Sequence, residues 1–190
     1  TLYAFLRKIY SPEIKIITIE DPIEYHLTGV TQTQTNEKKG YSFAEGLRSA
    51  LRQDPDVVMV GEIRDQETAE TAVQSALTGH IVFSTLHTNN AAGVIPRLIN
   101  LGVNPKIMVS ALSLSIAQRL VRKLCQFCKK ENTPTSEEIK TVKLVLDSMK
   151  EEGKDLLKYN IKTDANFKIF SAVGCEKCNK IGYKGRVGIF

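Results

Sequence analysis

Acidic and histidine side chains follow three short apolar runs of this sequence, at residues 14–19, 56–60 and 80–86. Glu20, Asp21 and Glu24 follow the first run, Glu62 and Arg64 follow the second, and Thr85 and His87 close the third. Carboxylate oxygens are ligands that Mg²⁺ prefers, and hydrolysis of a phosphoanhydride needs positioning, metal charge and an oriented water. The sequence therefore predicts magnesium and water chemistry on a phosphate-containing substrate.

Glu62 and Glu24 are the residues to which this chemistry assigns the main roles. Glu62 would hold magnesium, directly or through water, and Glu24 would orient or deprotonate the attacking water. His87 is a candidate donor to the γ-phosphate, or a sensor of it. Arg64 is a candidate partner of a carboxylate or a phosphate.

Structural roles are open for some of the neighbouring polar residues. We expect Asp65 to cap the helix that follows it, since an acidic residue after a strand often accepts a hydrogen bond from the first helical turn. Glu20 could begin a turn with Asp21 and Pro22. For His80, a hydrogen-bonded structural role fits the sequence as well as a catalytic one does.

The candidate residues can meet only if the three apolar runs are neighbouring strands. The polar segment 31–35 is predicted as an exposed edge strand or loop. Apolar spacing and capping signals predict helices over residues 1–10, 42–53, 66–78, 91–100 and 105–120. This alternation implies an α/β fold with a mostly parallel sheet and helices on both faces. We expect the three apolar strands to be buried, with their ligands at their carboxyl ends.

A phosphate-binding loop is missing from the 190 residues. No segment fits G-x-x-x-x-G-K-[ST], the pattern whose backbone N–H groups and lysine bind phosphates. Either the chain is not a nucleotide-hydrolysing domain, or it is a fragment that starts just after the loop. We expect a fragment of a longer protein, because the sequence starts with Thr1 and ends on a strand-like segment, 186–190. Its sequence shows no signal-peptide pattern and no apolar run near the roughly 20 residues that cross a bilayer.

Three sequence boxes resemble those of the secretion ATPases, the hexameric motors of type II secretion and type IV pilus assembly. Residues 17–25 (ITIEDPIEY) are similar to the Asp box, 56–65 (DVVMVGEIRD) to the Walker B box and 78–89 (TGHIVFSTLHTN) to the His box. Residues 117–122 and 182–186 match as well, so the resemblance covers nearly the whole chain. In that family the Walker A loop lies just before a helix that opens with Thr-Leu-Tyr, which is how this chain begins.

The resemblance implies a RecA-like P-loop ATPase core, residues 1–124, that lacks its Walker A loop. It implies that Glu24 is the catalytic carboxylate, that Glu62 supports Mg²⁺, and that His80 and His87 sense or contact ATP. The expected nucleotide-binding set is completed by Glu20, Asp21, Arg64 and Thr85. Without the loop, the fragment alone is expected to bind ATP poorly and to be inactive.

The resemblance also implies partners and a location for the full-length protein. We expect a homo-hexamer that powers type IV pilus assembly or type II protein secretion by moving an inner-membrane platform protein. Its expected place is the cytoplasm, at the inner face of the cytoplasmic membrane, with membrane association through its partners. No direct binding to nucleic acid is expected.

Two C-x-x-C pairs predict a structural zinc site in a second region, residues 125–190. The expected ligands are the thiolates of one tetrahedral S₄ site, Cys125, Cys128, Cys175 and Cys178. A spacer of 46 residues separates the pairs and must fold on its own. Disulfides are the alternative, and the cytosolic nucleotide chemistry predicted for the rest of the chain argues against them. By resemblance, assembly and secretion ATPases carry such a zinc module, whereas pilus retraction ATPases typically lack it.

Two other functions stay open at this point. Residues 1–114 carry 10 Lys and Arg against 12 Asp and Glu, whereas residues 115–190 carry 16 against 9. The alternative is therefore a zinc-dependent nucleic-acid-binding module on an α/β scaffold. Its aromatic residues are scattered, whereas stacking on single strands requires clustered ones. A structural scaffold with degenerate catalytic boxes is the third possibility, and the intact catalytic candidates weaken it.

Overall fold

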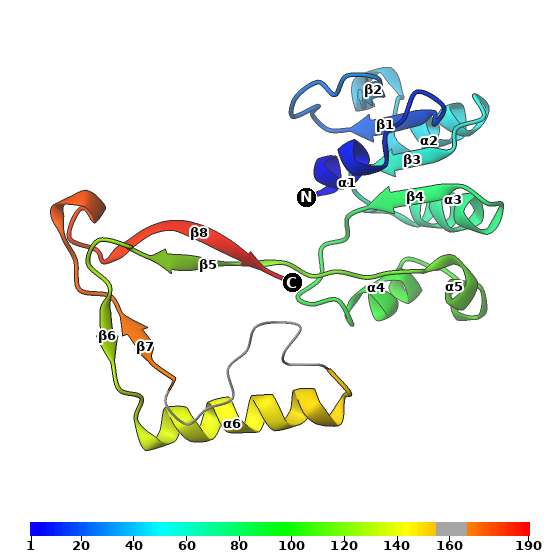
Figure 1. Ribbon diagram of the computed structural model, residues 1–190. Coiled ribbons are helices and arrows are strands. Elements are labelled where there is room, and N and C mark those ends of the chain that lie inside the picture. Colours follow the sequence, from blue (N-terminus) through cyan, green and yellow to red (C-terminus); the bar gives the residue numbers. More distant parts are fainter. Residues whose placement is uncertain (155–166) are drawn as a thin grey trace. The chain divides into compact units, whose positions relative to one another are not determined.

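Four parallel strands form the central sheet of residues 1–117, in the order β2-β1-β3-β4 (Figure 1). The strands are β1 (Ile16–Glu20), β2 (Thr31–Gln34), β3 (Val57–Val60) and β4 (Ile81–Ser84). The helices are α1 (Leu2–Ile9), α2 (Phe43–Leu51), α3 (Gln66–Leu77), α4 (Val94–Asn100) and α5 (Pro105–Ala111), with a 3₁₀ turn at Glu37–Lys39. The computed structural model describes residues 1–154 and 167–190. The α/β class and the parallel sheet predicted from the sequence are confirmed.

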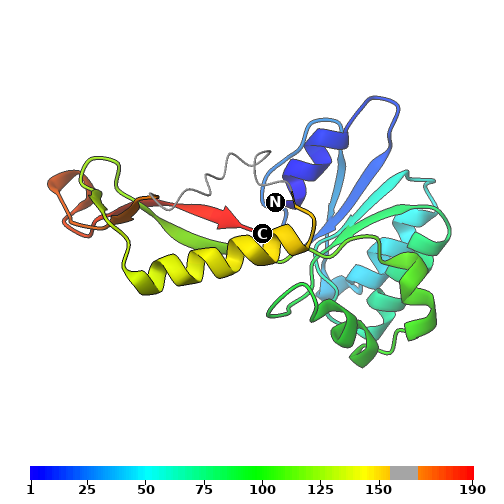
Figure 2. The same ribbon diagram turned by 60° about the horizontal axis from the view of Figure 1, so that its bottom comes forward.

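Helices cover both faces of this sheet, because alternate residues of a strand point to opposite sides. Ile17 and Ile19 of β1 belong to a core shared with α2, α3, α4 and α5. Ile16 belongs to a second core with Leu6 of α1. Figure 2 shows α1 on one side of the sheet and α2 and α3 on the other. Gly46 allows α2 to approach β1 closely, since a Cβ atom there would lie 2.7 Å from Ile19 Cγ2.

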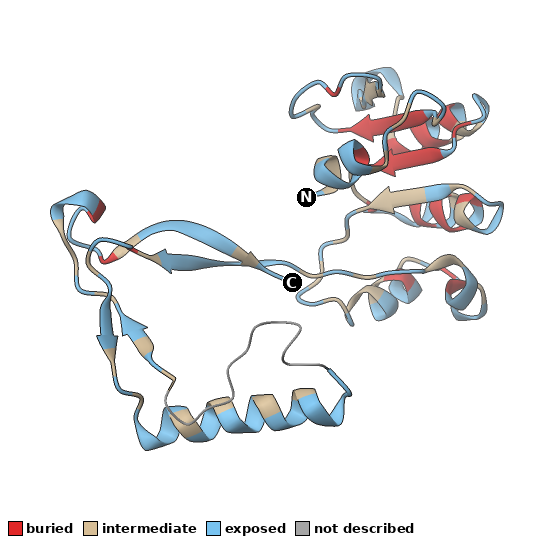
Figure 3. Ribbon diagram, viewed as in Figure 1, coloured by how far each residue is buried: buried red, intermediate tan, exposed pale blue. Residues whose placement is uncertain are grey.

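β4 departs from the burial that was predicted for all three apolar strands. β1 and β3 are buried along their whole length, whereas Ile81 of β4 is 54% exposed and the rest of β4 is half-buried (Figure 3). The reason is the strand order: β4 ends the sheet, so β3 is its single neighbour within the described residues. The polar strand β2 is at the other end, which confirms the edge strand predicted there.

The helix predicted over residues 105–120 is wrong after residue 111. α5 ends at Ala111, and Leu112 already has extended dihedral angles, φ −92° and ψ 100°. From Leu112 to Ile116, leucine or isoleucine alternates with serine, a period of two that suits an extended chain rather than a helix. Strand β5 (Arg119–Leu124) follows and pairs antiparallel with β8 (Tyr183–Ile189).

In the second compact unit, Gln118–Phe190, the described residues form two β ribbons and one long helix. β5 pairs with β8, and β6 (Lys130–Asn132) pairs with β7 (Ile169–Ser171). The helix α6 (Ser136–Glu151) starts at a capping box formed by Thr135 and Glu138, and a 3₁₀ turn covers Glu176–Cys178. β5 thus lies in this unit, although the sequence pattern put the boundary near residue 124. No helix among residues 1–154 and 167–190 has the length and apolar character to cross a bilayer.

α3 begins at an aspartate cap, as predicted from the sequence. The Asp65 carboxylate accepts hydrogen bonds from the Thr68 backbone N–H at 2.8 Å and from the Thr68 hydroxyl at 3.0 Å. Asp65→Ala removes both acceptors, so we expect the free energy of unfolding to fall by about 1 kcal/mol. Denaturant unfolding measures the loss, with Asp65→Asn, which keeps one acceptor oxygen, as the matched control. An alanine variant as stable as the parent would contradict the cap.

Candidate functional site

Two hydrogen bonds join the loop after β3 to the loop after β4 and bring Glu62 and His87 together. The Ile63 N–H donates to the Thr85 carbonyl oxygen at 3.0 Å, and the Thr85 hydroxyl donates to the Gly61 carbonyl oxygen at 2.7 Å. Across this junction His87 Nε2 lies 3.1 Å from Glu62 Oε2. Two of the three predicted strand ends therefore meet at one edge of the sheet.

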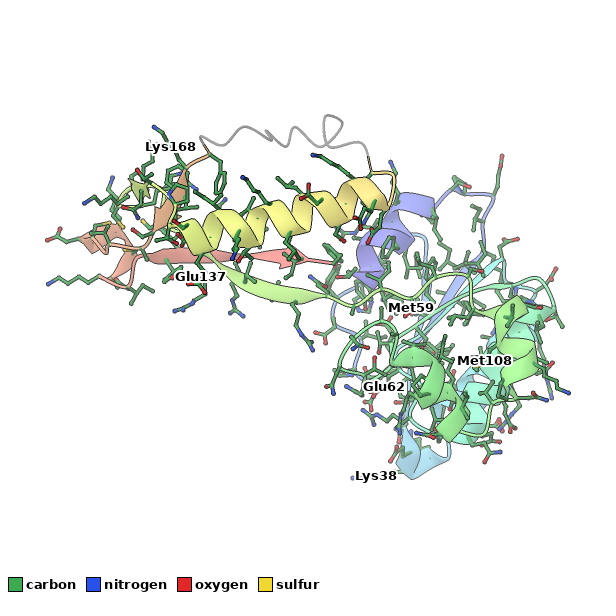
Figure 4. All side chains as sticks on the ribbon, turned by 90° about the horizontal axis from the view of Figure 1, so that it is seen from below. Lys38, Met59, Glu62, Met108, Glu137 and Lys168 are labelled. Atoms are coloured by element: carbon green, nitrogen blue, oxygen red, sulfur yellow. The ribbon has the colours of Figure 1, made fainter. Side chains whose placement is uncertain are left out.

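Glu62, labelled in Figure 4, is a half-buried carboxylate with a side-chain partner beside each oxygen. Arg64 forms an ion pair with Oε1, and His87 faces Oε2. The hydrogen bond from Arg64 lowers the pKa of Glu62, with smaller contributions from the Arg64 charge and from His87, while burial acts in the opposite direction. Glu62 is therefore ionised at neutral pH, as a carboxylate ligand of Mg²⁺ must be.

Arg64 connects this site to the segment that follows β1. Its pKa is raised first by the hydrogen bond and charge of Glu62, and further by the charges of Asp21 and Glu37. Asp21 comes directly after β1, and Glu37 lies in the 3₁₀ turn after β2. The charges of Glu62, Asp21 and Glu37 thus all act on the Arg64 guanidinium. Through Asp21, the segment after β1 also contributes to the electrostatics of this site.

Glu20, at the end of β1, points into the protein and is only 4% exposed. Its carboxylate accepts hydrogen bonds from the Tyr3 hydroxyl, from Thr18 Oγ1 at 2.5 Å and from Gln32 Nε2 at 2.9 Å. A buried carboxylate needs such donors, because unpaired burial of a charge costs several kcal/mol. The sequence did not single out Tyr3 or Gln32. Gln32 could have been found only by knowing that β2 pairs with β1, because that pairing places Gln32 opposite Thr18.

Glu24 lies in the segment between β1 and β2, and its side chain is exposed. The structure holds the main chain around it, since the Gln32 side-chain amide bonds the Tyr25 carbonyl oxygen at 3.3 Å and the Leu27 N–H at 2.6 Å. No described residue is in hydrogen-bond contact with its carboxylate. The catalytic role of Glu24 therefore stays a prediction.

His80 lies away from the Glu62 site. It precedes β4, whereas His87 follows β4, so the two histidines are at opposite ends of one strand. His80 Nδ1 is 3.1 Å from the Ser75 carbonyl oxygen and 3.2 Å from Thr78 Oγ1, at the C-terminal end of α3. Of the two roles left open for His80, this geometry is the one expected of a hydrogen-bonded structural histidine.

The second unit holds a cluster of thiols that matches the geometry of a zinc site. The sulfurs of Cys125, Cys128, Cys175 and Cys178 all lie within 4.8 Å of one another, and all four cysteines are free. Individual Sγ–Sγ separations are 4.0, 3.8 and 3.7 Å. A tetrahedral site with Zn–S bonds of about 2.3 Å separates its sulfurs by about 3.8 Å. The four residues therefore fit Zn²⁺ in both donor type and spacing.

Backbone N–H groups point at the sulfur of Cys178. The N–H of Cys175 lies 3.2 Å and the N–H of Gly182 lies 3.3 Å from Cys178 Sγ. Burial raises the pKa of this thiol, but the hydrogen bonds from the backbone of Cys175 and Gly182, together with those of the Cys175 and Cys128 side chains, lower it to about 6. Such donors stabilise a thiolate, which is the form of cysteine that binds metals.

Sequence comparisons match the chain to one family. The profile described as "Type II/IV secretion system protein" matches residues 1–190. The chain is 50% identical over 189 residues to the type II secretion system ATPase E of Vibrio cholerae. It is 47% identical over 190 residues to the type IV pilus assembly ATPase PilB of Pseudomonas aeruginosa. Each alignment covers 100% of this chain but only 34% and 31% of the two relatives, so the chain spans about a third of their length.

A comparison with solved structures found a protein whose fold is similar to that of this chain. The crystal structure of the pilus retraction motor PilT with bound ADP aligns with a TM-score of 0.54 and 41% sequence identity. The alignment covers 66% of this chain and 38% of that chain. The parallel α/β fold is therefore shared with a motor of this type.

Proposed function

Because the chain belongs to the type II/IV secretion system protein family, we propose that it is part of an ATP-hydrolysing motor subunit for type II protein secretion or type IV pilus assembly. The observation that carries the proposal is the pairing of Glu62 with His87 where β3 and β4 end. Ligands of parallel α/β sheets bind at this edge. The nucleic-acid-binding alternative loses support, since the relatives matched over the whole chain are secretion and pilus ATPases.

Glu62 is the residue proposed to hold Mg²⁺, directly or through a water. Its lowered pKa and its position in a loop after a buried strand fit that role. When bound, Mg²⁺ neutralises charge that develops on the phosphates. Arg64 pairs with Glu62 and is the candidate for orienting it, while the charge of Asp21 acts on Arg64. His87, which is 85% exposed, is free to turn toward a γ-phosphate.

Glu24 is proposed to orient or deprotonate the attacking water. Its exposure fits a group that must reach a solvent molecule.

Thr85 is proposed to support the site by joining the loops after β3 and β4, because its hydroxyl donates a hydrogen bond to the Gly61 carbonyl oxygen. The remaining requirement is a phosphate cradle, for which residues 1–190 contain no G-x-x-x-x-G-K-[ST] segment. The two relatives are about three times as long as this chain, so we propose that the phosphate-binding loop lies outside residues 1–190 in the full-length protein.

The wider assembly is proposed from the family. The core is RecA-like and works in a cytoplasmic homo-hexamer at the inner face of the cytoplasmic membrane, where it acts on an inner-membrane platform protein. The four clustered cysteines are proposed to bind one structural zinc. The cysteine pairs favour an assembly or export motor over a retraction motor.

Steady-state hydrolysis of ATP by the full-length protein tests the proposal. We expect turnover that requires Mg²⁺ and stops when the ion is chelated. A strain without the gene should then lose either secretion of exported proteins or surface pili, and the lost phenotype identifies the machine. Full-length protein that binds no ATP and releases no phosphate would overturn the proposal.

A further inference from the structure

A buried hydrogen-bond cluster links α1, the end of β1 and β2. Its members, called here the Glu20 cluster, are Tyr3, Thr18, Glu20 and Gln32. Glu20 is 4% exposed and accepts from all three of the others. All the hydrogen bonds that Glu20 accepts come from the other three residues of the cluster, and its carboxylate is therefore directed into the protein rather than toward Glu62 and His87. The function proposed above leaves this cluster without a role.

Tyr3 extends the cluster to the segment that carries Glu24. Its hydroxyl donates to Glu20 Oε2 and accepts from Gln32 Nε2 at 3.2 Å. Burial, the hydrogen bond to Glu20 and the charge of Glu20 raise the pKa of Tyr3 to about 12, while backbone hydrogen bonds from Glu24 and Tyr25 oppose that rise. The phenol therefore keeps its proton at neutral pH and stays a donor to Glu20.

Gln32 holds the same segment from the other side. Its Nε2 donates to Glu20 at 2.9 Å and to the Tyr25 carbonyl oxygen at 3.3 Å, and its Oε1 accepts from the Leu27 N–H at 2.6 Å. The Tyr25 ring packs edge-on against the Tyr3 ring, with 4.6 Å between the centroids. Tyr25 and Leu27, which follow Glu24 in the chain, are thus attached to α1 through Tyr3 and to β2 through Gln32, and both of these side chains bond Glu20.

We propose that Tyr3, Glu20 and Gln32 are positioning residues that fix the main chain on which Glu24 is carried. The inference rests on the proposed function, in which Glu24 acts on the attacking water. A general base must stay within hydrogen-bond reach of its water, so a small displacement of its side chain lowers the rate of the reaction step. Glu20 accordingly acts through Tyr3 and Gln32 and is assigned no contact with nucleotide.

Tyr3→Phe in the full-length protein tests the inference, because it deletes the shared hydroxyl and keeps the ring. We expect kcat for ATP hydrolysis to fall about tenfold with an unchanged KM, since positioning of the base affects the reaction step and not nucleotide binding. Hydrogen exchange at the backbone amides of residues 23–27 should become about tenfold faster. Gln32→Met, which removes the second support, should have the same two effects.

Tyr25→Phe is the matched control, because the Tyr25 hydroxyl bonds no described residue while its ring stays against Tyr3. It should leave both kcat and exchange unchanged. Combining Tyr3→Phe with Glu24→Gln should reduce kcat no further than Glu24→Gln alone, as expected of residues that act through one another.

Each contrary result identifies what fails. Unchanged exchange at residues 23–27 in Tyr3→Phe overturns the inference, whether or not the protein hydrolyses ATP. Faster exchange with unchanged kcat overturns it as well, because the position of the segment would then not matter to the reaction. A wild-type protein without turnover overturns the proposed function, and the exchange data still decide whether the Glu20 cluster positions the segment.

Discussion

Glu62→Gln in the full-length protein is expected to reduce ATP turnover at least about a hundredfold, the scale seen when a charged group that acts on the transition state is removed. The amide has nearly the shape of the carboxylate but lacks its charge, so it loses the ion pair with Arg64 and the affinity for Mg²⁺. Phosphate release at saturating ATP and Mg²⁺ measures the effect. Because shape is conserved, the melting temperature should move little.

Glu24→Gln is expected to cause a loss of similar size for a different reason, since an amide cannot take a proton from water. Glu67→Gln is the matched control, because Glu67 is exposed and pairs with Arg48 at 2.6 Å on the surface, outside the site. It should keep turnover within about twofold, as surface ion pairs contribute little. Wild-type turnover in both Glu62→Gln and Glu24→Gln would contradict the motor assignment.

Removal of zinc is the second change for which we expect a large effect. Among the described residues of the second unit, the two buried side chains are Cys125 and Cys178, whereas α6 and the ribbons are exposed or half-buried (Figure 3). Because these described residues form no apolar core, we expect the unit to depend on metal binding, which contributes on the order of 10 kcal/mol at structural zinc sites. We expect the native full-length protein to contain one zinc per chain.

Stripping the metal with a strong chelator should unfold this unit while the first unit stays folded. The measurements are the metal content and the hydrogen exchange of residues 118–154 and 167–190 before and after chelation. Cys178→Ser should reproduce the unfolding, because serine replaces a thiolate ligand with a hydroxyl that stays protonated. Phe127→Ala is the matched control: Phe127 stands between two ligands in the sequence, is 66% exposed and should leave the zinc content unchanged. Native protein without zinc would contradict the assignment.

Much of the fold follows from local sequence signals. The helix cap at Ser42, whose side chain accepts from the Glu45 N–H, and the cap at Asp65 are both fixed by residues three positions apart. The apolar runs of β1 and β3 mark strands buried on both faces, and each boundary lies within two residues of the prediction. The cysteine spacing likewise predicted a cluster that the structure brings together.

Contacts between distant segments were not predictable from the sequence. The burial of Glu20 depends on Tyr3, 17 positions away, and on Gln32, 12 positions away, and neither carries a local pattern that marks it. The low burial of β4 follows from its place in the strand order, which its apolar sequence does not encode. The placement of His80 follows from the direction of β4: both histidines belong to one sequence box, yet the strand separates them.

The cysteine cluster and the β6–β7 pair hold together the two ends of the 46-residue spacer between Cys128 and Cys175. The chain leaves the cluster at Cys128 as β6 and returns to Cys175 through β7, and these two strands pair side by side. The ends of the stretch between β6 and β7 are therefore held together whatever its length, so adding residues there costs little chain entropy. Lengthening the chain between β6 and β7 is therefore expected to leave the four cysteine sulfurs close together.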